Sequence, residues 1–398
     1  MQTHPSQPTD ATLGRWDDIR ITILGSLLYL AGSGVLYVMP SYLDHLSAVF
    51  RLSASQAGLV SGGETLSIAC SALLSGLVIN RFGPRLALAS ILVCILGDLA
   101  SNAIGRFDVL FGVRVLTGVF GEGPAYALGF AVLARSPNPD RAFGWAFLVI
   151  VAVASGAIGW SQQLNGLGPC GVLLPFVALY ILTGLSTLWT PKPRPAGTTR
   201  REQGPLWRAG GFWLLVGIAI WYGAPEMFWA FAVPISSGHG VSGAGIVWAM
   251  ALSLGLGVIG AFLPILLGDR FGRVGPIFAA TALLGVSTLA AATVHHAALL
   301  AAGLGAFNSA WNLAAVYQLA SLAVVDRTGR YTGFAAFAQV LGQAMGPAVG
   351  GFLIDGLGPS TVPWGVVALA VAGSTIFLAV ALSSKIGAAA VPALVAPE

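Results

Sequence analysis

Twelve windows of mostly apolar residues follow one another along the chain, and each is about as long as the helix needed to cross a bilayer. They run approximately over residues 19–43, 56–79, 86–105, 109–134, 142–164, 171–190, 211–235, 244–267, 274–294, 297–325, 331–354 and 363–384. The runs are continuous and do not alternate in polarity, as the strands of a transmembrane barrel would. The sequence therefore predicts an all-α membrane protein with twelve transmembrane helices.

The composition excludes a water-soluble globular protein. Charged residues make up 9% of the chain and apolar residues 56%, whereas soluble domains carry about 25% charged residues. Cys70, Cys94 and Cys170 show neither a disulfide framework nor metal-ligand spacing, and the histidines do not cluster at such spacing. We therefore expect no metal and no cofactor. The basic residues lie in short loops and form no long patch, so we expect no nucleic-acid partner.

The basic residues also predict how the chain is oriented in the membrane, because cytoplasmic loops retain Lys and Arg. With a cytoplasmic N-terminus, sixteen of the nineteen basic residues fall inside; Arg51 and Arg106 fall outside, and Arg114 lies within a span. An even number of spans then returns the C-terminus to the cytoplasm. We expect a multi-pass protein of the cell membrane with both termini cytoplasmic.

A polar, Pro- and Arg-rich segment divides the spans six and six. We interpret residues 191–210 as a cytoplasmic linker between an N-terminal six-helix bundle (19–190) and a C-terminal six-helix bundle (211–384). Residues 1–18 and 385–398 are expected to be cytoplasmic tails.

Three loops of the first half recur in the second half at a nearly constant offset. Residues 80–85 match 269–273 and residues 141–144 match 330–333, both at an offset of 189, and residues 166–169 match 356–359 at an offset of 190. Three loops in register indicate a six-helix unit that was duplicated in parallel, as in transporters whose two bundles rock about a site between them.

With these motifs, the sequence resembles the major facilitator superfamily over essentially its whole length. The family's loop pattern Gly-x-x-x-Asp-Arg-x-Gly-x-Arg occurs here as Gly76, Asn80, Arg81, Gly83 and Arg85, with Asn80 in place of the acid. The loop after the eighth span keeps Asp269, Arg270, Gly272 and Arg273. The resemblance implies two pseudo-symmetric six-helix bundles, held together in one access state by these loops as a conformational latch. The substitution at Asn80 weakens the first half of that latch.

The fourth predicted span carries a second resemblance. Arg114-x-x-x-Gly118 is similar to the family's buried arginine that is linked to proton transfer. In the organic-anion symporters of the family a glutamate follows this arginine by seven residues, whereas Glu122 follows by eight. The glycines and proline of the eleventh span resemble a motif that drug antiporters carry in span five, which is the symmetry-related helix.

Five ionisable residues lie inside predicted spans: Glu64, Asp98, Arg114, Glu122 and Glu226. Each costs about 2.5 to 3.5 kcal/mol at a helix centre, so these side chains must line a cavity or pair with one another. Loss of water favours the protonated form of a carboxylate, which can then carry a proton through a transport cycle. We predict that Glu122 is the proton carrier and Glu226 the second candidate, with Arg114 and Glu64 taking part in coupling. For Asp98 we expect a structural role, and a static ion pair with Arg114 is the alternative for Glu122.

Aromatic and amide side chains share one face on spans one, seven and ten, at steps of three and four residues. In the resembled family these helices, together with span four, line the central cavity. The candidate substrate-binding residues are Tyr29, Tyr37, Tyr222, Trp229, Asn308, Trp311, Asn312 and Gln318. For each residue alone, packing between helices is the alternative.

These observations predict a secondary active transporter and not an enzyme. It would move a small organic solute by alternating access, coupled to protons, and work as a monomer in the lipid bilayer. The sequence contains no nucleotide-binding loop of the Gly-x-x-x-x-Gly-Lys-Ser/Thr kind, which argues against ATP as the driver. The four intramembrane acids slightly favour efflux of a cationic or neutral drug by antiport, whereas Arg114 would favour import of an organic anion by symport. A polytopic membrane enzyme and a non-transporting sensor are minor alternatives.

Overall fold

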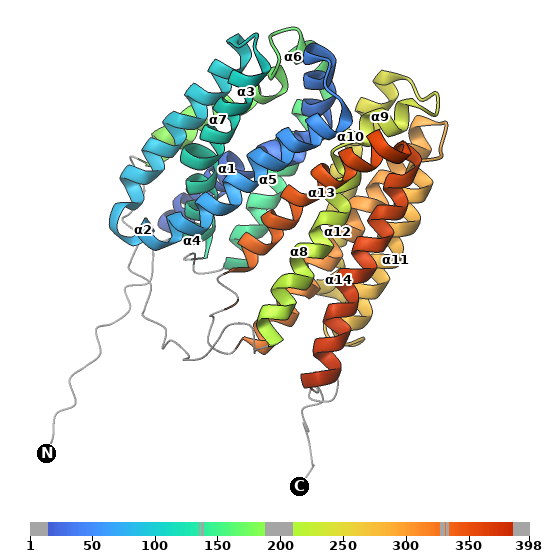
Figure 1. Ribbon diagram of the computed structural model, residues 1–398. Coiled ribbons are helices and arrows are strands. Elements are labelled where there is room, and N and C mark those ends of the chain that lie inside the picture. The colour runs from blue at the N-terminus through green and yellow to red at the C-terminus, as the bar shows by residue number, and fades with distance from the viewer. Residues whose placement is uncertain are drawn as a thin grey trace, which may run out of the picture.

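The structure is a computed structural model, which describes residues 15–134, 136, 139–187, 210–326, 331 and 334–384. Within these ranges the regular elements are all helices (Figure 1). In chain order they are α1 (Arg15–Phe50), α2 (Ala54–Ala103), α3 (Phe107–Thr117), the π-helix η1 (Gly118–Glu122), α4 (Gly123–Leu133), α5 (Pro139–Gly159), α6 (Ser161–Asn165), the 3-10 helix η2 (Gly171–Leu173), α7 (Leu174–Thr187), α8 (Gly210–Trp229), α9 (Ala232–Ser237), α10 (Gly243–Leu267), α11 (Val274–Ala291), α12 (Ala297–Val325), α13 (Ala335–Leu357), the 3-10 helix η5 (Pro359–Thr361) and α14 (Val362–Ser384).

The helices of the described residues reproduce the predicted spans. Eleven segments are long and apolar enough to cross a membrane, and the shorter apolar segment Gly171–Thr187 occupies the place of the sixth predicted span. Several boundaries differ from the prediction. Helix α1 continues to Phe50, beyond residue 43, and α5 and α8 end at Gly159 and Trp229, each followed by a separate short helix, α6 or α9. The predicted linker and both tails lie almost wholly outside the described residues, so those boundaries stay predictions.

Helix α2 contains two spans, Ala54–Gly76 and Gly83–Ala103. Glu64 and Asp98 lie 34 residues apart in it, which would separate them by about 50 Å along a straight helix. Both nevertheless contact Arg114, so the chain must fold back between them. Figure 1 shows this reversal, with helical backbone continuing through the predicted loop at residues 80–85 and through Pro84.

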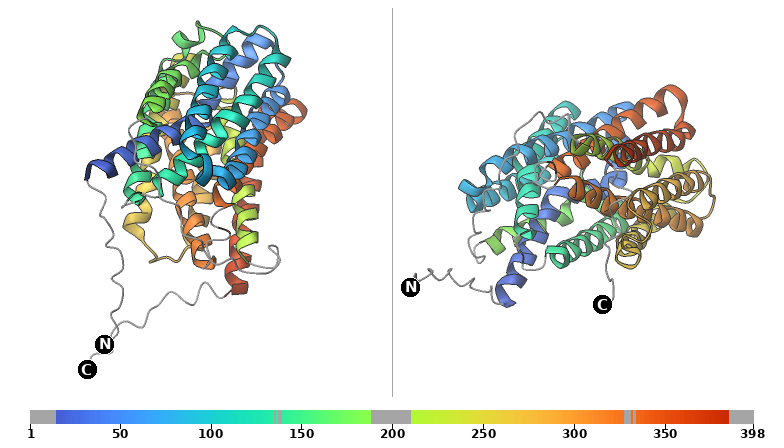
Figure 2. Two further views of the ribbon diagram at one scale, coloured as in Figure 1. Left: turned by 90° about the vertical axis from the view of Figure 1, so that its left-hand side faces the viewer. Right: turned by 90° about the horizontal axis from the view of Figure 1, so that it is seen from below.

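Elements α1–α7 pack into one group and α8–α14 into a second group beside it (Figures 1 and 2). The groups meet where α2 packs on α13 and α5 packs on α10. Glycines allow α2 and α13 to approach closely, since Gly58 lies against the backbone of Pro347, and Gly351 lies against that of Ala54. Asp355 joins the same contact from the C-terminal part of α13. Its carboxylate oxygens accept hydrogen bonds from the backbone N–H groups of Ala54, at 3.1 Å, and Ser55, at 2.9 Å.

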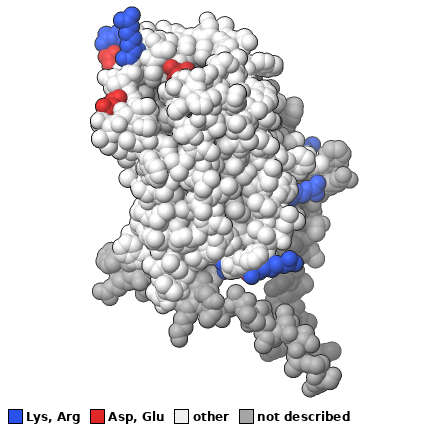
Figure 3. Space-filling model, turned by 90° about the vertical axis from the view of Figure 1, so that its right-hand side faces the viewer, with Lys and Arg blue, Asp and Glu red and all other residues white. Residues whose placement is uncertain are grey.

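The outer surface suits a lipid environment. Large apolar side chains are exposed along the helices, among them Leu74, Ile265 and Leu382. Figure 3 shows one face of the molecule, on which uncharged residues cover a broad central area and the charged side chains lie towards its margins. A few charged side chains are instead buried between the helices, and these form the candidate site.

Candidate functional site

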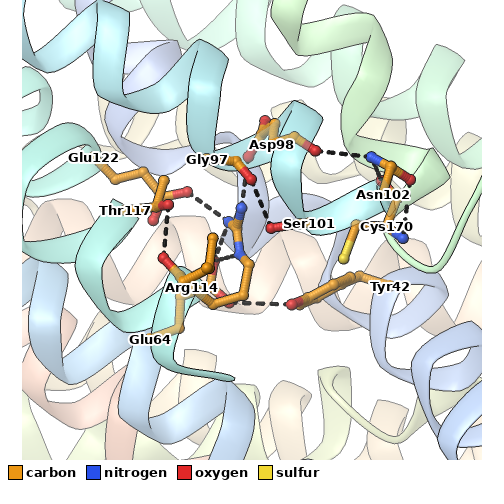
Figure 4. Close-up of polar contacts among 11 residues, drawn as sticks. Tyr42, Glu64, Gly97, Asp98, Ser101, Asn102, Arg114, Thr117, Glu122 and Cys170 are labelled. Atoms are coloured by element: carbon orange, nitrogen blue, oxygen red, sulfur yellow. Dashed lines mark hydrogen bonds and ion pairs between the residues drawn. The ribbon is translucent and has the colours of Figure 1, made fainter. Parts of the chain in front are cut away.

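Arg114 of α3 lies at the centre of a buried cluster of charged side chains (Figure 4). Its Nε donates to Glu64 Oε1 at 2.9 Å, and its Nη2 also contacts that oxygen. Its Nη1 donates to Asp98 Oδ1 at 2.5 Å, and its Nη2 donates to Glu122 Oε1 at 2.8 Å. All four side chains are at most 2% exposed. We call Glu64, Asp98, Arg114 and Glu122 the acid–arginine cluster.

A π-helical turn brings Glu122 to this cluster. In a regular α-helix, eight residues rotate a side chain through about 80° beyond two whole turns, so Glu122 would lie about a quarter of a turn away from Arg114 around the helix. The five residues of η1 form a π-helix, which takes up one extra residue. The spacing of eight therefore acts as a spacing of seven, and both side chains face the same way. Gly118 lets α2 approach η1, because it lies against Ser67 and the backbone carbonyl of Glu64.

The acid–arginine cluster contains more acid than base. Three carboxylates share one guanidinium, so the cluster would carry a net charge of −2 if every group were ionised. The Tyr42 hydroxyl donates to Glu64 Oε2 at 3.4 Å, and the guanidinium carbon of Arg114 lies 5.9 Å from the centre of the Tyr42 ring. Glu122 Oε2 has no hydrogen-bond partner among the described residues. An excess of buried charge is costly, and binding a proton is a direct way to lower that cost.

Glu226 lies apart from this cluster, on α8 of the second group. Its side chain is 1% exposed, and neither carboxylate oxygen has a partner among the described residues. Gly346 of α13 packs against its Cβ atom. The structure therefore brings Glu64 and Glu122 together with Arg114, which fits both the coupling prediction and its alternative, a static ion pair, and it leaves Glu226 as a separate buried carboxyl group.

Four tyrosines from both groups lie near one another, and we call Tyr29, Tyr37, Tyr126 and Tyr222 the tyrosine cluster. The rings of Tyr29 and Tyr126 stack with their centres 5.6 Å apart. Tyr222 comes from the second group, yet it lies within electrostatic range of Tyr29, Tyr37 and Tyr126. Gln339 of α13 donates from Nε2 to the Tyr222 hydroxyl at 2.7 Å, and Trp311 lies edge-on to the Tyr222 ring with centres 6.2 Å apart.

The other predicted substrate-binding residues do not join this cluster through a direct contact. Asn308 donates to Ser253 Oγ at 3.1 Å and Asn312 donates to the carbonyl of Gly257 at 2.9 Å, so both hold α12 against α10. Trp229 is 2% exposed and stacks on Phe307. Gln318 is fully buried, and its amide has no partner among the described residues. The contacts of Asn308, Asn312 and Trp229 join neighbouring helices, whereas the Gln318 amide makes none among the described residues. A role of these residues in solute binding stays a prediction.

Sequence reasoning missed Tyr126 and Gln339. Tyr126 follows Glu122 by four residues, so the two side chains lie on one face of a helix, and this signal was present in the sequence. Gln339 lies on the eleventh predicted span, among the glycines and the proline that resemble the antiporter motif. Its role depends on the approach of α13 to α8, which no local pattern reveals.

The predicted latch does not join the two groups through its described side chains. Asp269 pairs with Arg273 of its own loop at 3.3 Å, and Gly272 adopts a left-handed conformation with φ of 63°. Open space surrounds Gly76 and Gly83. The side chains of Asn80 and Arg81 lie outside the described residues. The latch therefore stays a prediction.

An apolar cavity of about 390 Å³ lies between α8 and α13. Phe212, Leu215, Val216 and Ala219 line it from α8, and Phe337, Ala338 and Leu341 line it from α13, together with Tyr331 and Phe334 just before that helix. Ala219 precedes Tyr222 by three residues and Ala338 is next to Gln339. Gly342, next to the lining residue Leu341, packs against the Cβ atom of Tyr222, so the cavity lies close to Tyr222, although neither Tyr222 nor Gln339 is among its lining residues.

Two paired helical groups with buried charges are typical of a polytopic transport protein. Comparison with known proteins identifies its family. A family model described as Major Facilitator Superfamily matches residues 21–305, which is more than half of the chain. The chain belongs to this superfamily and is a secondary transporter, not an enzyme.

Solved structures support the fold. A crystal structure of a mutant of nucleoside transporter NupG is similar to the chain with a TM-score of 0.68 and 14% identity, covering 91% of this chain and 99% of that one. The structure of a D-xylose-proton symporter is similar with a TM-score of 0.66 and 16% identity, covering 90% of this chain and 96% of that one. The comparison with curated proteins gives no significant match. At these identities the structural likeness shows the fold alone.

Proposed function

We propose that the protein is a proton-coupled symporter in which the acid–arginine cluster binds the proton and the tyrosine cluster binds the solute. The observation that carries this proposal is the separation of the two clusters. The acid–arginine cluster lies within the first helical group at no more than 2% exposure, whereas the tyrosine cluster combines side chains of both groups. A proton and a solute with separate sites can be bound at the same time, which symport requires.

Glu122 is the proposed proton carrier, because its position links the two clusters. It accepts a hydrogen bond from Arg114, and Tyr126 lies one helical turn further on. Protonation of Glu122 would weaken its pairing with Arg114, and the change would pass along α4 to the stacked rings of Tyr29 and Tyr126. Glu64 and Asp98 keep the guanidinium occupied throughout. Glu226 is the second proposed proton-binding group.

We favour symport over antiport because three of the four intramembrane acids, Glu64, Asp98 and Glu122, are paired with Arg114. Glu226 has no partner among the described residues, and exchange of a cationic solute for a proton at Glu226 is the antiport alternative. One of the similar structures is titled a D-xylose-proton symporter, which is consistent with the proposed mode.

We further propose that both termini are cytoplasmic and that the chain works as a monomer in the cell membrane. The positive-inside pattern supports the orientation. The chain crosses at α1 before it reaches Ala54, and it crosses at α14 after it passes Asp355. The contact between Ala54 and Asp355 therefore lies on the proposed outer side.

The experiment measures proton movement in proteoliposomes that enclose a pH-sensitive dye. A thermal-shift screen that starts with uridine and D-xylose selects the solute, since a ligand bound only by the folded protein raises its melting temperature. Adding that solute outside should acidify the lumen with the wild-type protein. In the variant Glu122→Gln the rate of lumen acidification should fall about tenfold or more, in line with the loss of a positioned proton-transfer group.

Asp108→Asn is the matched control, because Asp108 is 65% exposed and pairs only locally with Arg106. This control should keep the signal. Alkalinisation of the lumen by the wild-type protein would replace symport with antiport. Unchanged proton movement in Glu122→Gln would remove Glu122 from the role of carrier.

A further inference from the structure

We propose that the solute is an uncharged molecule with a flat, hydrogen-bonding ring, and that Tyr126, Tyr222 and Gln339 determine this specificity. The inference rests on the proposed transport function and deepens it by naming the substrate class. It follows from where the structure places charge and where it places hydroxyl groups, amides and rings.

The first step is that four of the five buried ionisable side chains, all except Glu226, are already paired with one another. Arg114 would attract an organic anion, but its guanidinium already donates to Glu64, Asp98 and Glu122. Those same carboxylates would attract a cation, but each is held by Arg114 at no more than 2% exposure. A charged solute would have to break this network and leave a buried charge unpaired, which is costly.

The second step is the chemistry of the tyrosine cluster. Phenol rings offer flat faces for stacking and hydroxyl groups that both donate and accept hydrogen bonds. Tyr29 and Tyr37 are only partly buried, while Tyr126 and Tyr222 are each 6% exposed. The Tyr222 hydroxyl already accepts from Gln339, so it keeps its own proton free to donate. This set matches a neutral ring that carries both donors and acceptors.

The third step is the adjoining cavity. Among the described residues, its lining between α8 and α13 contains no acidic or basic side chain. The space next to Tyr222 and Gln339 therefore gives a charged substituent no partner, whereas it accommodates an apolar edge of a ring. Glu226 follows Tyr222 by one helical turn, but it is 1% exposed and lies against Gly346.

The test compares molecules that share a ring and differ in charge. Equilibrium binding to the purified full-length protein is measured for adenosine, 1-methyladenosine and adenosine monophosphate, and for nicotinamide, 1-methylnicotinamide and nicotinate. In at least one set the neutral member should bind about tenfold or more tightly than both charged members, because an unpaired charge is costly to bury. Tightest binding of a cation overturns the inference and assigns Glu226 as its partner. Tightest binding of an anion, or no neutral member binding up to its solubility limit, also overturns it.

Variants then locate the site. Tyr222→Phe keeps the ring and removes the hydroxyl, so the neutral probe should bind about tenfold more weakly, as expected for a lost hydrogen bond in a desolvated site. Tyr126→Phe and Gln339→Leu should weaken binding in the same direction. Tyr317→Phe is the matched control, because the Tyr317 hydroxyl donates to the carbonyl of Gly268, at the far end of α10. Equal weakening in Tyr317→Phe and Tyr222→Phe, or none in either, overturns the assignment of the site.

The outcomes separate this inference from the proposed function. If a neutral probe binds but a pH gradient fails to drive its uptake, proton coupling is wrong and the substrate class stands. If a pH gradient drives uptake of a charged solute alone, the coupling stands and the substrate class is wrong.

Discussion

Removing the Asp355 carboxylate should open the contact between the two helical groups. In the structure this carboxylate accepts hydrogen bonds from the first two N–H groups of α2, at 3.1 Å and 2.9 Å. These N–H groups have no partner within their own helix, and the helix dipole favours a negative charge beside them. The contact joins the two groups, so it stabilises only the arrangement in which α2 and α13 are together at this end.

The expected effect follows from the exposure of the pair. A charge at a helix N-terminus contributes about 0.3 to 1 kcal/mol at an exposed site, and a lost capping bond costs about 0.5 to 2 kcal/mol. Asp355 is exposed, so solvent screening limits the sum to about 1 kcal/mol. Asp355→Ala should therefore shift the equilibrium about fivefold away from the arrangement in the structure. High salt should reduce the difference between the variant and the wild-type protein.

Spin-label distances measure this equilibrium. Labels at Gln163→Cys and Ser237→Cys, in a Cys70→Ser background, report on α6 of the first group and α9 of the second; both sites are exposed. The population at the longer distance should grow in Asp355→Ala. Asp108→Asn is the control, because its ion pair with Arg106 lies within one group. Unchanged populations in Asp355→Ala, or the same shift in Asp108→Asn, would refute the reasoning.

Two further predictions concern the acid–arginine cluster. Arg114→Ala leaves three buried carboxylates without their counter-charge, and the loss of folded stability should be about 3 to 5 kcal/mol; a melting temperature in detergent that matches the wild-type value would contradict this. Gly118→Ala places a methyl group against Ser67 and the carbonyl of Glu64 and should cost about 1 to 3 kcal/mol through overpacking. Gly112→Ala on the same span is the control, because its methyl group would point into open space. Gly118→Ala should therefore melt at a lower temperature than Gly112→Ala, and equal melting temperatures would contradict the packing argument.

The spans could be predicted because transfer into a bilayer depends on local composition. Each run of about twenty apolar residues favours insertion on its own account, whatever the rest of the chain does. The same reasoning required Arg114 to have acidic partners, since a lone charge in lipid is costly. It did not select those partners, because Glu64 and Asp98 are distant in sequence and meet only through the reversal within α2.

Glu122 and Gln339 show two other limits of sequence reasoning. Steps of four residues predicted a shared face for Arg114 and Glu122, but the spacing of eight differed from the family's seven, and the π-helix η1 takes up the extra residue. Gln339 reaches Tyr222 because glycines let α13 approach α8, where Gly342 lies against the backbone of Ala219. Both outcomes depend on backbone geometry that hydropathy and spacing do not encode.

The amino-acid sequence by itself determined that the chain crosses a membrane many times and which few charges it must bury, because these follow from the transfer cost of each segment. Only the tertiary structure decided which charges neutralise one another and which rings stand free of charge between the two groups. Ion pairs and close contacts act over a few ångströms, so they are settled by the side chains that the folded helices bring together.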